Sequence, residues 1–458
     1  MSIVSLLAAH LNDATITVLS PAKIVYREPG VALLDNEQIT IGNGAFASAR
    51  LKPRLCQNTF WSQLSTDRID DRRFEHLSAA DLVSRQLESI WRAAGGQGDR
   101  LVVAIPAYMN TDNLGLLLGI AAELDIPILA IVDAAVAATR RQYRNAVPVH
   151  VDLSLHSASL TRIGQSGKAQ VERSAVVDAG GLLALYDAWI RVIAEAFVQQ
   201  SRFDPLHTAE TEQAMQDQLP GWLLQAAAED KVLLEVEYRD IRHAAEIDSL
   251  DLVAAAAPVY QRIVNHLRAL YRADETPAIQ MSDRAARMPG LADMLRARVG
   301  GEVFLLEPGA TARGLLARCR DMQATAGTIS LIRQLPWDQS AIELEAKPVA
   351  GGGGQPTHLL FGDSAIELDE RPLKLGTQPV DGERWIDLRQ DMPGVSRQHC
   401  SVGQENGQCI VRDHSRYGTF LNGHRIDGSA VLQVGDRLRI GTPGFEFRLI
   451  TTRSAHGT

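Results

Sequence analysis

The sequence predicts a multidomain protein, with a mixed α/β region at residues 1–330, a glycine-rich linker at 331–356 and an all-β sandwich at 357–458. Apolar strand-like runs alternate with helix-like segments between residues 101 and 144, which is typical of a layered α/β domain. The C-terminal region consists of short strand-like runs separated by turn residues, as in a β-sandwich. The run Gly351–Gly354 lies between the two regions, and ordering glycine costs the most backbone entropy.

The length and net charge of the chain limit the number of its domains and the kinds of molecule that it can bind. A length of 458 residues accommodates two or three domains, and a net charge of −9 argues against broad binding to nucleic acid or anionic membranes. Any anion site must therefore be local. The start of the chain lacks the pattern of a secretory signal, and no run approaches the roughly 20 apolar residues of a membrane span, so we expect a cytoplasmic protein.

The cysteines favour buried thiols. The four of them, Cys56, Cys319, Cys400 and Cys409, show no metal-ligand spacing, so no metal site is expected. Cys400 and Cys409 flank one predicted hairpin, which leaves a disulfide between them as the alternative.

The first 75 residues predict β-structure, with strands at 14–19, 23–26, 31–34 and 38–41. A helix is expected from Ser78, a suitable N-cap, with Leu82, Val83, Leu87 and Ile90 on one face.

Alternating strands and helices follow. The expected elements are a strand at 101–106, a helix from Thr111 or Asp112 to Leu124, a strand at 126–132, an Ala-rich helix at 134–144 and strands at 149–155 and 159–163. Helices are expected to dominate 180–273, followed by a strand at 278–281, a helix at 291–299, a strand at 303–306 and a helix at 309–320.

The order of these elements and two short motifs resemble the actin and heat-shock-chaperone ATPase superfamily. The motifs are Pro106-Ala107-Tyr108-Met109-Asn110 and Val132-Asp133-Ala134-Ala135-Val136-Ala137-Ala138. The resemblance covers about residues 14–320 and implies two ribonuclease-H-like lobes.

The phosphate-binding hairpins of that superfamily are not recognisable. The first position is taken as Thr17–Pro21, which has neither aspartate nor glycine, and Pro21 has no N–H to donate. The second retains Asp152 but has Leu155, His156 and Ser157 in place of small residues. The adenosine-side pattern is expected at Met281–Pro289, without its glycine pair.

The nucleotide-binding candidates that the resemblance leaves are Asp152, Gly180 and Gly181. Each also has a plain structural interpretation, a turn cap for Asp152 and a strand-to-helix turn for the glycines. The sequence therefore predicts a degenerate ATPase fold that acts as scaffold, with no catalytic residue, no metal and no ATP or other cofactor.

The C-terminal region resembles a forkhead-associated (FHA) domain. The resemblance is carried by Ser396-Arg397-Gln398-His399, by Gly418-Thr419-Phe420-Leu421-Asn422-Gly423 and by the run from Leu432 to Gly441. It implies a β-sandwich that binds phosphothreonine peptides through loops at one end.

The family's ligand contacts are only partly present. Gly376-Thr377 stands where the family has Gly-Arg, and Tyr417 stands where it has an asparagine. Arg397 and Arg416, on neighbouring loops, are candidates to supply the positive charge, while a role as solvated loop residues stays open. The candidate peptide-binding residues are thus Ser396, Arg397, Arg416, Tyr417 and Thr377, and the loop-structural residues are Gly376, His399, Gly418, Asn422 and Gly423.

Together these features predict an interaction protein that recruits a protein partner through an FHA domain, with phosphothreonine dependence left open. The domain pairing suggests bacterial signalling by analogy alone. The alternative is an ATP-binding, chaperone-like ATPase that is regulated through the FHA domain.

Overall fold

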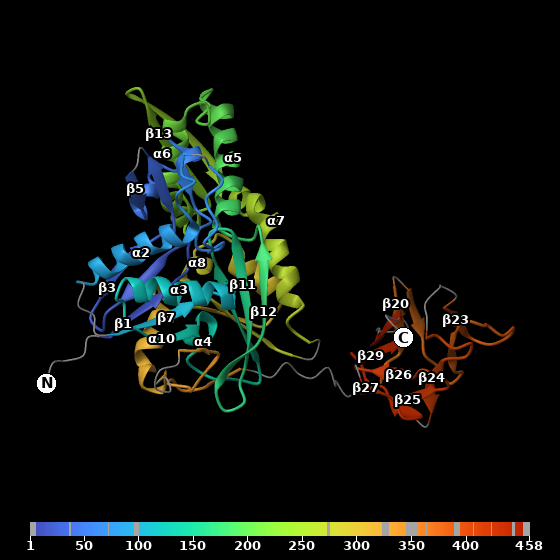
Figure 1. Ribbon diagram of the computed structural model, residues 1–458. Helices are drawn as coiled ribbons and strands as arrows, with labels where there is room; N and C mark the ends of the chain where they lie inside the picture. The colour runs from blue at the N-terminus through green and yellow to red at the C-terminus, as the bar shows by residue number, and fades with distance from the viewer. Residues whose placement is uncertain are drawn as a thin grey trace. The chain divides into compact units, whose positions relative to one another are not determined.

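The computed structural model describes residues 6–35, 38–71, 73–95, 100–272, 275–322, 329–344, 355–362, 364–388, 394–405, 407–422, 424–441 and 445–451. The chain divides into two compact units, Met1–Glu345 and Ala346–Thr458. The first unit is mixed α/β and the second is all β (Figure 1), so the expected order of fold classes is confirmed.

One six-stranded sheet of the first unit has the strand order β17-β8-β7-β1-β2-β3. An antiparallel meander of β1, β2 and β3 comes first, and β7, β8 and β17 extend it in parallel. The bounds are Leu6–His10 (β1), Ile16–Leu19 (β2), Ile24–Glu28 (β3), Arg100–Ile105 (β7), Ile128–Asp133 (β8) and Leu331–Ile332 (β17). The sequence analysis does not predict β1, the strand that joins the meander to the parallel strands.

The second six-stranded sheet, β16-β15-β10-β11-β12-β18, repeats this arrangement. Its meander is β10, β11 and β12, and β15 and β16 continue from β10 in parallel. The bounds are Val147–Leu153 (β10), Ser157–Gly164 (β11), Ala169–Asp178 (β12), Pro277–Met281 (β15), Glu302–Leu305 (β16) and Gln334–Leu335 (β18). The first unit therefore has two lobes that share one order of five strands, whereas the sixth strand lies at the parallel edge of the first sheet (β17) and at the meander edge of the second (β18).

The helices lie against these sheets (Figure 1), and their bounds are Asn43–Phe46 (α1), Ala79–Ala93 (α2), Thr111–Glu123 (α3), Ala134–Ala138 (α4), Leu182–Ser201 (α5), Ala209–Ala226 (α6), Ser249–Arg268 (α7), Asp283–Ala286 (α8), Leu291–Arg298 (α9) and Ala310–Ala317 (α10). Ser78 caps α2 in a reciprocal capping box with Asp81, as predicted. Asn110, rather than Thr111 or Asp112, caps α3.

Two predictions for the first unit are wrong. The Ala-rich helix ends at Ala138 instead of continuing to residue 144, because the chain turns after Thr139 and Tyr143–Arg144 (β9) pairs with Ile342–Glu343 (β19). Within the span expected to be helical, Lys231–Tyr238 (β13) and Ile241–Asp248 (β14) form a hairpin. A small sheet completes the unit, with Ala32–Asp35 (β4) between Gln38–Ile41 (β5) and Cys56–Gln57 (β6).

The segment 329–344 fastens the two lobes together. Its strand β17 extends the first sheet beside β8, and β18 extends the second sheet beside β12. These residues therefore belong to the first unit, and the expected linker begins too early at residue 331. Its glycine run, 351–354, lies outside the described residues.

An apolar layer fills the space between the two sheets. Ala8 and Val102 of the first sheet and Ile163 of the second share one cluster of buried residues with Val136 of α4 and Leu315 of α10. Burial of this layer, at about 25 cal/mol per Å² of apolar surface, couples the lobes directly.

The second unit consists of two sheets packed face to face, β21-β20-β30-β29-β26-β27 and β23-β22-β24-β25-β28. The bounds are His358–Phe361 (β20), Ser364–Glu367 (β21), Leu373–Gly376 (β22), Trp385–Asp387 (β23), Cys400–Glu405 (β24), Gln408–Asp413 (β25), Thr419–Leu421 (β26), His424–Arg425 (β27), Ser429–Val431 (β28), Arg437–Ile440 (β29) and Phe445–Ile450 (β30). Leu375, Val402, Val411 and Phe447 lie in the core between the sheets.

Cys400 and Cys409 are free thiols, so the alternative of a disulfide is wrong. Cys409 pairs in register with Gln404, and Cys400 pairs with Asp413 at the other end of the hairpin. Burial raises the pKa of the Cys409 thiol to about 11, which keeps it protonated and unreactive.

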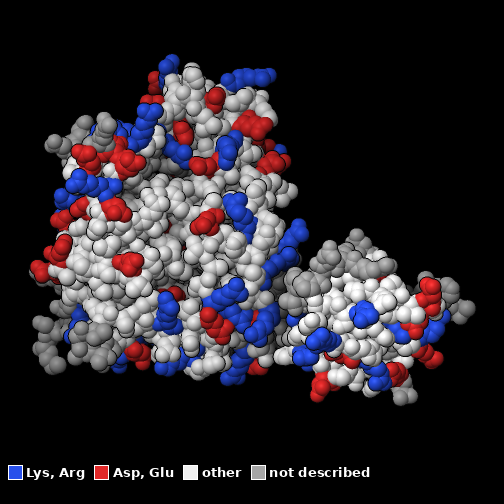
Figure 2. All heavy atoms as spheres, turned by 45° about the vertical axis from the view of Figure 1, so that its right-hand side comes forward, with Lys and Arg blue, Asp and Glu red and all other residues white. Residues whose placement is uncertain are grey.

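Basic and acidic side chains are interspersed over the face shown in Figure 2. Because the two signs of charge alternate over this face, binding of an anion there would depend on a few local groups rather than on a broad positive field. Among the described residues, no helix has the length and apolar character that a membrane span requires.

Candidate functional site

The loops at one end of the sandwich are held by His399, which is fully buried. Its Nδ1 accepts a hydrogen bond from the Ser396 backbone N–H at 3.0 Å, so Nε2 carries the proton and donates to the Gly418 carbonyl at 3.3 Å. Burial lowers the pKa of His399, which favours this neutral form. The histidine thus joins the loop at 394–399 to the loop at 414–418.

Ser396 lies where these two loops touch. Its Oγ accepts a hydrogen bond from the Arg416 backbone N–H at 3.2 Å, which leaves the hydroxyl proton available to donate to a ligand. The Thr377 N–H donates to the Ser396 carbonyl at 3.3 Å, so the end of β22 joins the same site. The structure therefore brings Ser396, Thr377 and the Arg416 backbone together.

Gly376 allows this close approach. A Cβ atom at that position would collide with the carbonyl group of Arg397. Any larger residue would push the loop away from β22, so glycine is required by contact rather than by an unusual φ angle.

Arg397, Arg416 and Tyr417 are exposed around Ser396, and Tyr417 keeps 61% of its surface accessible. Within the described part of the chain, neither guanidinium forms an ion pair or hydrogen bond. Both cations can therefore turn toward a ligand phosphate without first breaking a contact.

Hydrogen bonds to Asp413 and Ser415 shape the loop at 414–418, and Asn422 lies in the turn after β26. Asp413 Oδ1 accepts hydrogen bonds from the Ser415 N–H at 3.0 Å and the Thr419 hydroxyl at 2.8 Å, and Ser415 Oγ accepts from the Gly418 N–H at 2.7 Å. Gly418 has a φ of 94°, which favours glycine, and Asn422 has a φ of 51°. Gly423 lies outside the described residues.

The second candidate site, at Asp152 between the lobes of the first unit, is filled by protein groups. Arg284 Nη2 donates to both carboxylate oxygens of Asp152, at 2.8 and 2.7 Å, and Asn12 Nδ2 donates to Oδ2 at 2.8 Å. Burial opposes ionisation of Asp152, yet the charge of Arg284 outweighs it and holds the pKa of that carboxyl below its usual range. Asp152 is thus the counterion of a buried arginine.

The first hairpin beside Asp152 lies earlier in the chain than Thr17–Pro21, where it is expected from the sequence. Those residues lie in β2 and the turn after it, while the β1–β2 turn is Leu11–Thr15. The displacement follows from the strand β1, which the sequence prediction lacks. The turn places His10, Asn12 and Asp13 in the interior, beside Asp152.

Asp13 connects this turn to the opposite lobe. Its Oδ1 accepts a hydrogen bond from the Leu155 N–H at 2.8 Å, while Oδ2 is buried without a partner among the described residues. Burial raises the pKa of Asp13 to about 6, and burial together with the nearby charge of Arg284 lowers that of His10 to about 3.

Gly180 and Gly181 lie between β12 and α5. A Cβ on Gly181 would lie 2.5 Å from backbone atoms of Leu155, His156 and Ser157. The first amides of α5 donate to this same turn, Leu182 N–H to Ser154 O at 2.9 Å and Leu183 N–H to Leu155 O at 3.0 Å. The first two amides of α5 are therefore already bonded to carbonyl oxygens and are not free to bind a phosphate.

Little space remains beside Arg284. The cavity lined by His10, Thr17, Ser282, Arg284 and Gly309 has a volume of about 10 Å³, room for roughly one water molecule. In the described ranges, no group of three or more His, Cys, Asp or Glu side chains is arranged to hold a metal ion.

Sequence reasoning missed Arg284, Asn12 and His10 as members of this junction. The available signal was that Arg284 lies inside the Met281–Pro289 segment, where the resemblance expects small residues facing a nucleotide.

The second unit is a β-sandwich with a polar loop surface at one end. The FHA domain family matches residues 379–441, so this unit contains an FHA domain. An FHA domain implies phosphopeptide-mediated protein–protein interaction. No curated protein matches the chain.

Proposed function

We propose that this chain is an interaction protein whose FHA domain recruits a phosphothreonine-containing partner through the loops at 394–399 and 414–418. The supporting observation is that two exposed arginines, Arg397 and Arg416, lie on the two loops that meet at Ser396, whose Oγ accepts a hydrogen bond from the Arg416 backbone N–H. A phosphate dianion is bound best by charge-assisted hydrogen bonds. This chain has Thr377 at the position of the family's arginine, and Arg397 and Arg416 would supply the positive charge instead.

The Ser396 hydroxyl would supply a neutral donor between the two charges. One of its two acceptor lone pairs is used by the Arg416 N–H, and the hydroxyl proton is left to donate to the phosphate. Tyr417, at the position of the family's asparagine, would pack its exposed ring against the peptide.

For the first unit we propose an actin/chaperone-like fold that serves as a scaffold without nucleotide chemistry. The repeated strand order of its two lobes supports the fold. The Arg284–Asp152 pair, the bonded amides of Leu182 and Leu183, and the small residual cavity support the absence of ATP turnover. The alternative of a regulated ATPase would require this junction to open and expose a buried ion pair.

Titration of the full chain with phosphopeptides tests the proposed recognition. A degenerate peptide pool with a central phosphothreonine should bind at least about tenfold more tightly than the same pool with threonine, a difference of about 1.4 kcal/mol. Equal affinity for both pools would contradict phosphate-dependent binding.

A further inference from the structure

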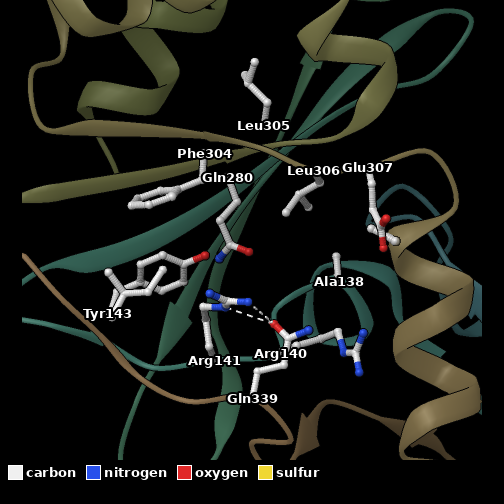
Figure 3. A pocket seen from close by; sticks show the side chains of 12 residues that line it. Ala138, Arg140, Arg141, Tyr143, Gln280, Phe304, Leu305, Leu306, Glu307 and Gln339 are labelled. Atoms are coloured by element: carbon white, nitrogen blue, oxygen red, sulfur yellow. Dashed lines mark hydrogen bonds between the residues drawn. The ribbon is translucent and has the colours of Figure 1, made fainter.

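A cavity of about 310 Å³ in the first unit does not include Asp152 or Arg284 in its lining, although it shares Leu306, Glu307 and Ala310 with the small cavity beside Arg284. Its lining comes from β15, β16, the chain after α4 and the segment at 339–342 (Figure 3). This volume lies at the lower end of the range for small-molecule sites.

The cavity contains one arginine whose charge is not neutralised. Arg141 donates from Nε and Nη2 to the neutral Gln339 Oε1, at 2.9 and 2.6 Å, which fixes the guanidinium and leaves Nη1 unused. The other charged lining groups are paired, Arg140 with Asp338 and Glu307 with Arg313. Arg141 forms no ion pair within the described ranges, so the cavity carries a net positive charge.

Two further polar groups face the cavity near Arg141 (Figure 3). The Gln280 side chain is 1% exposed and donates from Nε2 to Thr139 Oγ1 at 3.1 Å, while its Oε1 accepts no hydrogen bond from the described residues. The Tyr143 hydroxyl likewise has no partner in the described part of the chain. The site thus offers a cation, a hydroxyl donor and an amide acceptor.

The remaining walls are apolar. The rings of Tyr143 and Phe304 are tilted with their centroids 4.8 Å apart, and Leu305, Leu306 and Ile342 continue the surface.

From this arrangement we propose that the cavity binds a small organic monocarboxylate that has an apolar body and one hydrogen-bond donor. The carboxylate pairs with Arg141 and accepts from the Tyr143 hydroxyl, the donor bonds to Gln280 Oε1, and the body packs on Phe304 and Ile342. A nucleoside triphosphate does not fit this site, because its several negative charges would face a single unpaired cation. The inference is independent of the function proposed for the FHA domain.

Calorimetric titration of the full chain with three matched probes tests the proposal. 3-Phenyllactate carries all three features, 3-phenylpropionate lacks the hydroxyl, and 3-phenyllactamide lacks the charge. We expect 3-phenyllactate to bind with a Kd below about 1 mM, 3-phenylpropionate several-fold more weakly, and the amide at least about tenfold more weakly. Failure of 3-phenyllactate to bind below 10 mM, or equal binding of the amide or of inorganic phosphate, would overturn it.

Variants localise the binding to this cavity. Arg141→Gln should weaken 3-phenyllactate at least about tenfold, and Tyr143→Phe about threefold to tenfold. Arg144→Gln is the matched control, because Arg144 is exposed, follows Tyr143 on β9 and does not line the cavity. This change should leave the Kd of 3-phenyllactate unchanged. Should Arg141→Gln lower the melting temperature of the first unit, Tyr143→Phe, which keeps the ring and removes only the hydroxyl donor, tests the same site. Unchanged binding in a folded Arg141 variant would contradict the proposal.

Discussion

Arg284 and Asp152, which are 132 positions apart in the sequence, form a doubly bonded ion pair in the interior of the first unit. Each residue comes from a segment that the resemblance to ATPases assigns to nucleotide contact. The guanidinium therefore supplies the positive charge beside Asp152 from within the protein. Because the pair joins β10 to α8 within the second lobe and is buried, it is a strong test of that lobe's stability.

Arg284→Met should destabilise the first unit by about 3–5 kcal/mol, because it leaves Asp152 charged, buried and unpaired. The double variant Arg284→Met, Asp152→Leu should recover much of this loss, since both charges are then absent. Scanning calorimetry of the full chain gives the transition of the first unit, with that of the second as internal reference. Arg287→Met, at an exposed arginine three positions after Arg284, should cost no more than about 0.5 kcal/mol.

Asp13→Asn should stabilise the first unit at pH 7 to 8 by up to about 3 kcal/mol. Burial raises the pKa of this carboxyl from 3.8 to about 6. The folded state therefore loses stability as the pH rises from 3.8 through about 6, and the loss is nearly complete at pH 7 to 8. The asparagine keeps the acceptor for the Leu155 N–H. Its advantage over the native chain should disappear by pH 4, and an advantage that is constant from pH 4 to 8 would argue against this origin. The exposed Asp178→Asn is the control.

Mg·ATP at about 1 mM should leave the melting temperature of the first unit unchanged, because a ligand stabilises only a state that binds it. Differential scanning fluorimetry measures this, and the variant Arg284→Ala, Asp152→Asn examines whether removal of the ion pair restores a site. A clear upward shift for the native chain would favour the regulated ATPase instead.

Arg397→Ala and Arg416→Ala should each weaken phosphothreonine-peptide binding by about 1.5–3 kcal/mol, the range for a hydrogen bond to a charged group. The unphosphorylated peptide should respond to neither change. Arg371→Ala, an exposed arginine beyond the opposite end of β22, should have no effect on affinity. A result in which Arg371→Ala matches the other two would indicate attraction by overall charge rather than a local site.

Acidification should loosen the peptide-binding loops. The folded pKa of His399 lies below the unfolded value of 6.5, so the unfolded chain gains a proton first and stability falls as the pH drops below about 6.5. Protonation of Nδ1 would also remove the hydrogen bond from the Ser396 N–H. The second unit's melting temperature should decrease from pH 7 to 5, and His399→Asn should flatten this dependence, whereas the exposed His424→Gln should not.

Local sequence rules predict those parts of the structure that depend on local chemistry. Ser78 caps its helix because its hydroxyl and Asp81 satisfy backbone groups three residues apart. The loop residues Ser396, His399 and Gly418 also follow from a contiguous pattern. By contrast, the Ala-rich stretch after Asp133 has high helix propensity, but pairing of Tyr143 with Ile342 overrides it, and that partner lies far away in the chain.

The lobe junction could not be predicted for the same reason. Nothing near Asp152 indicates that Arg284 will neutralise it, and nothing near Asp13 indicates that its acceptor serves the Leu155 amide. Without β1 the first turn is displaced along the sequence, so His10 and Asn12 could not be recognised as its members. Long-range pairing of buried polar groups becomes visible only once the strand order is known.

The segment 329–344 determines the order in which edge strands of the first unit would detach under tension. Tension applied through the C-terminal tether reaches β19 first, then β18 on one sheet and finally β17 on the other, and each is a ladder of only two residues. A partner that pulls on the tail would therefore unzip these short contacts one after another, and would release the second lobe's edge before that of the first.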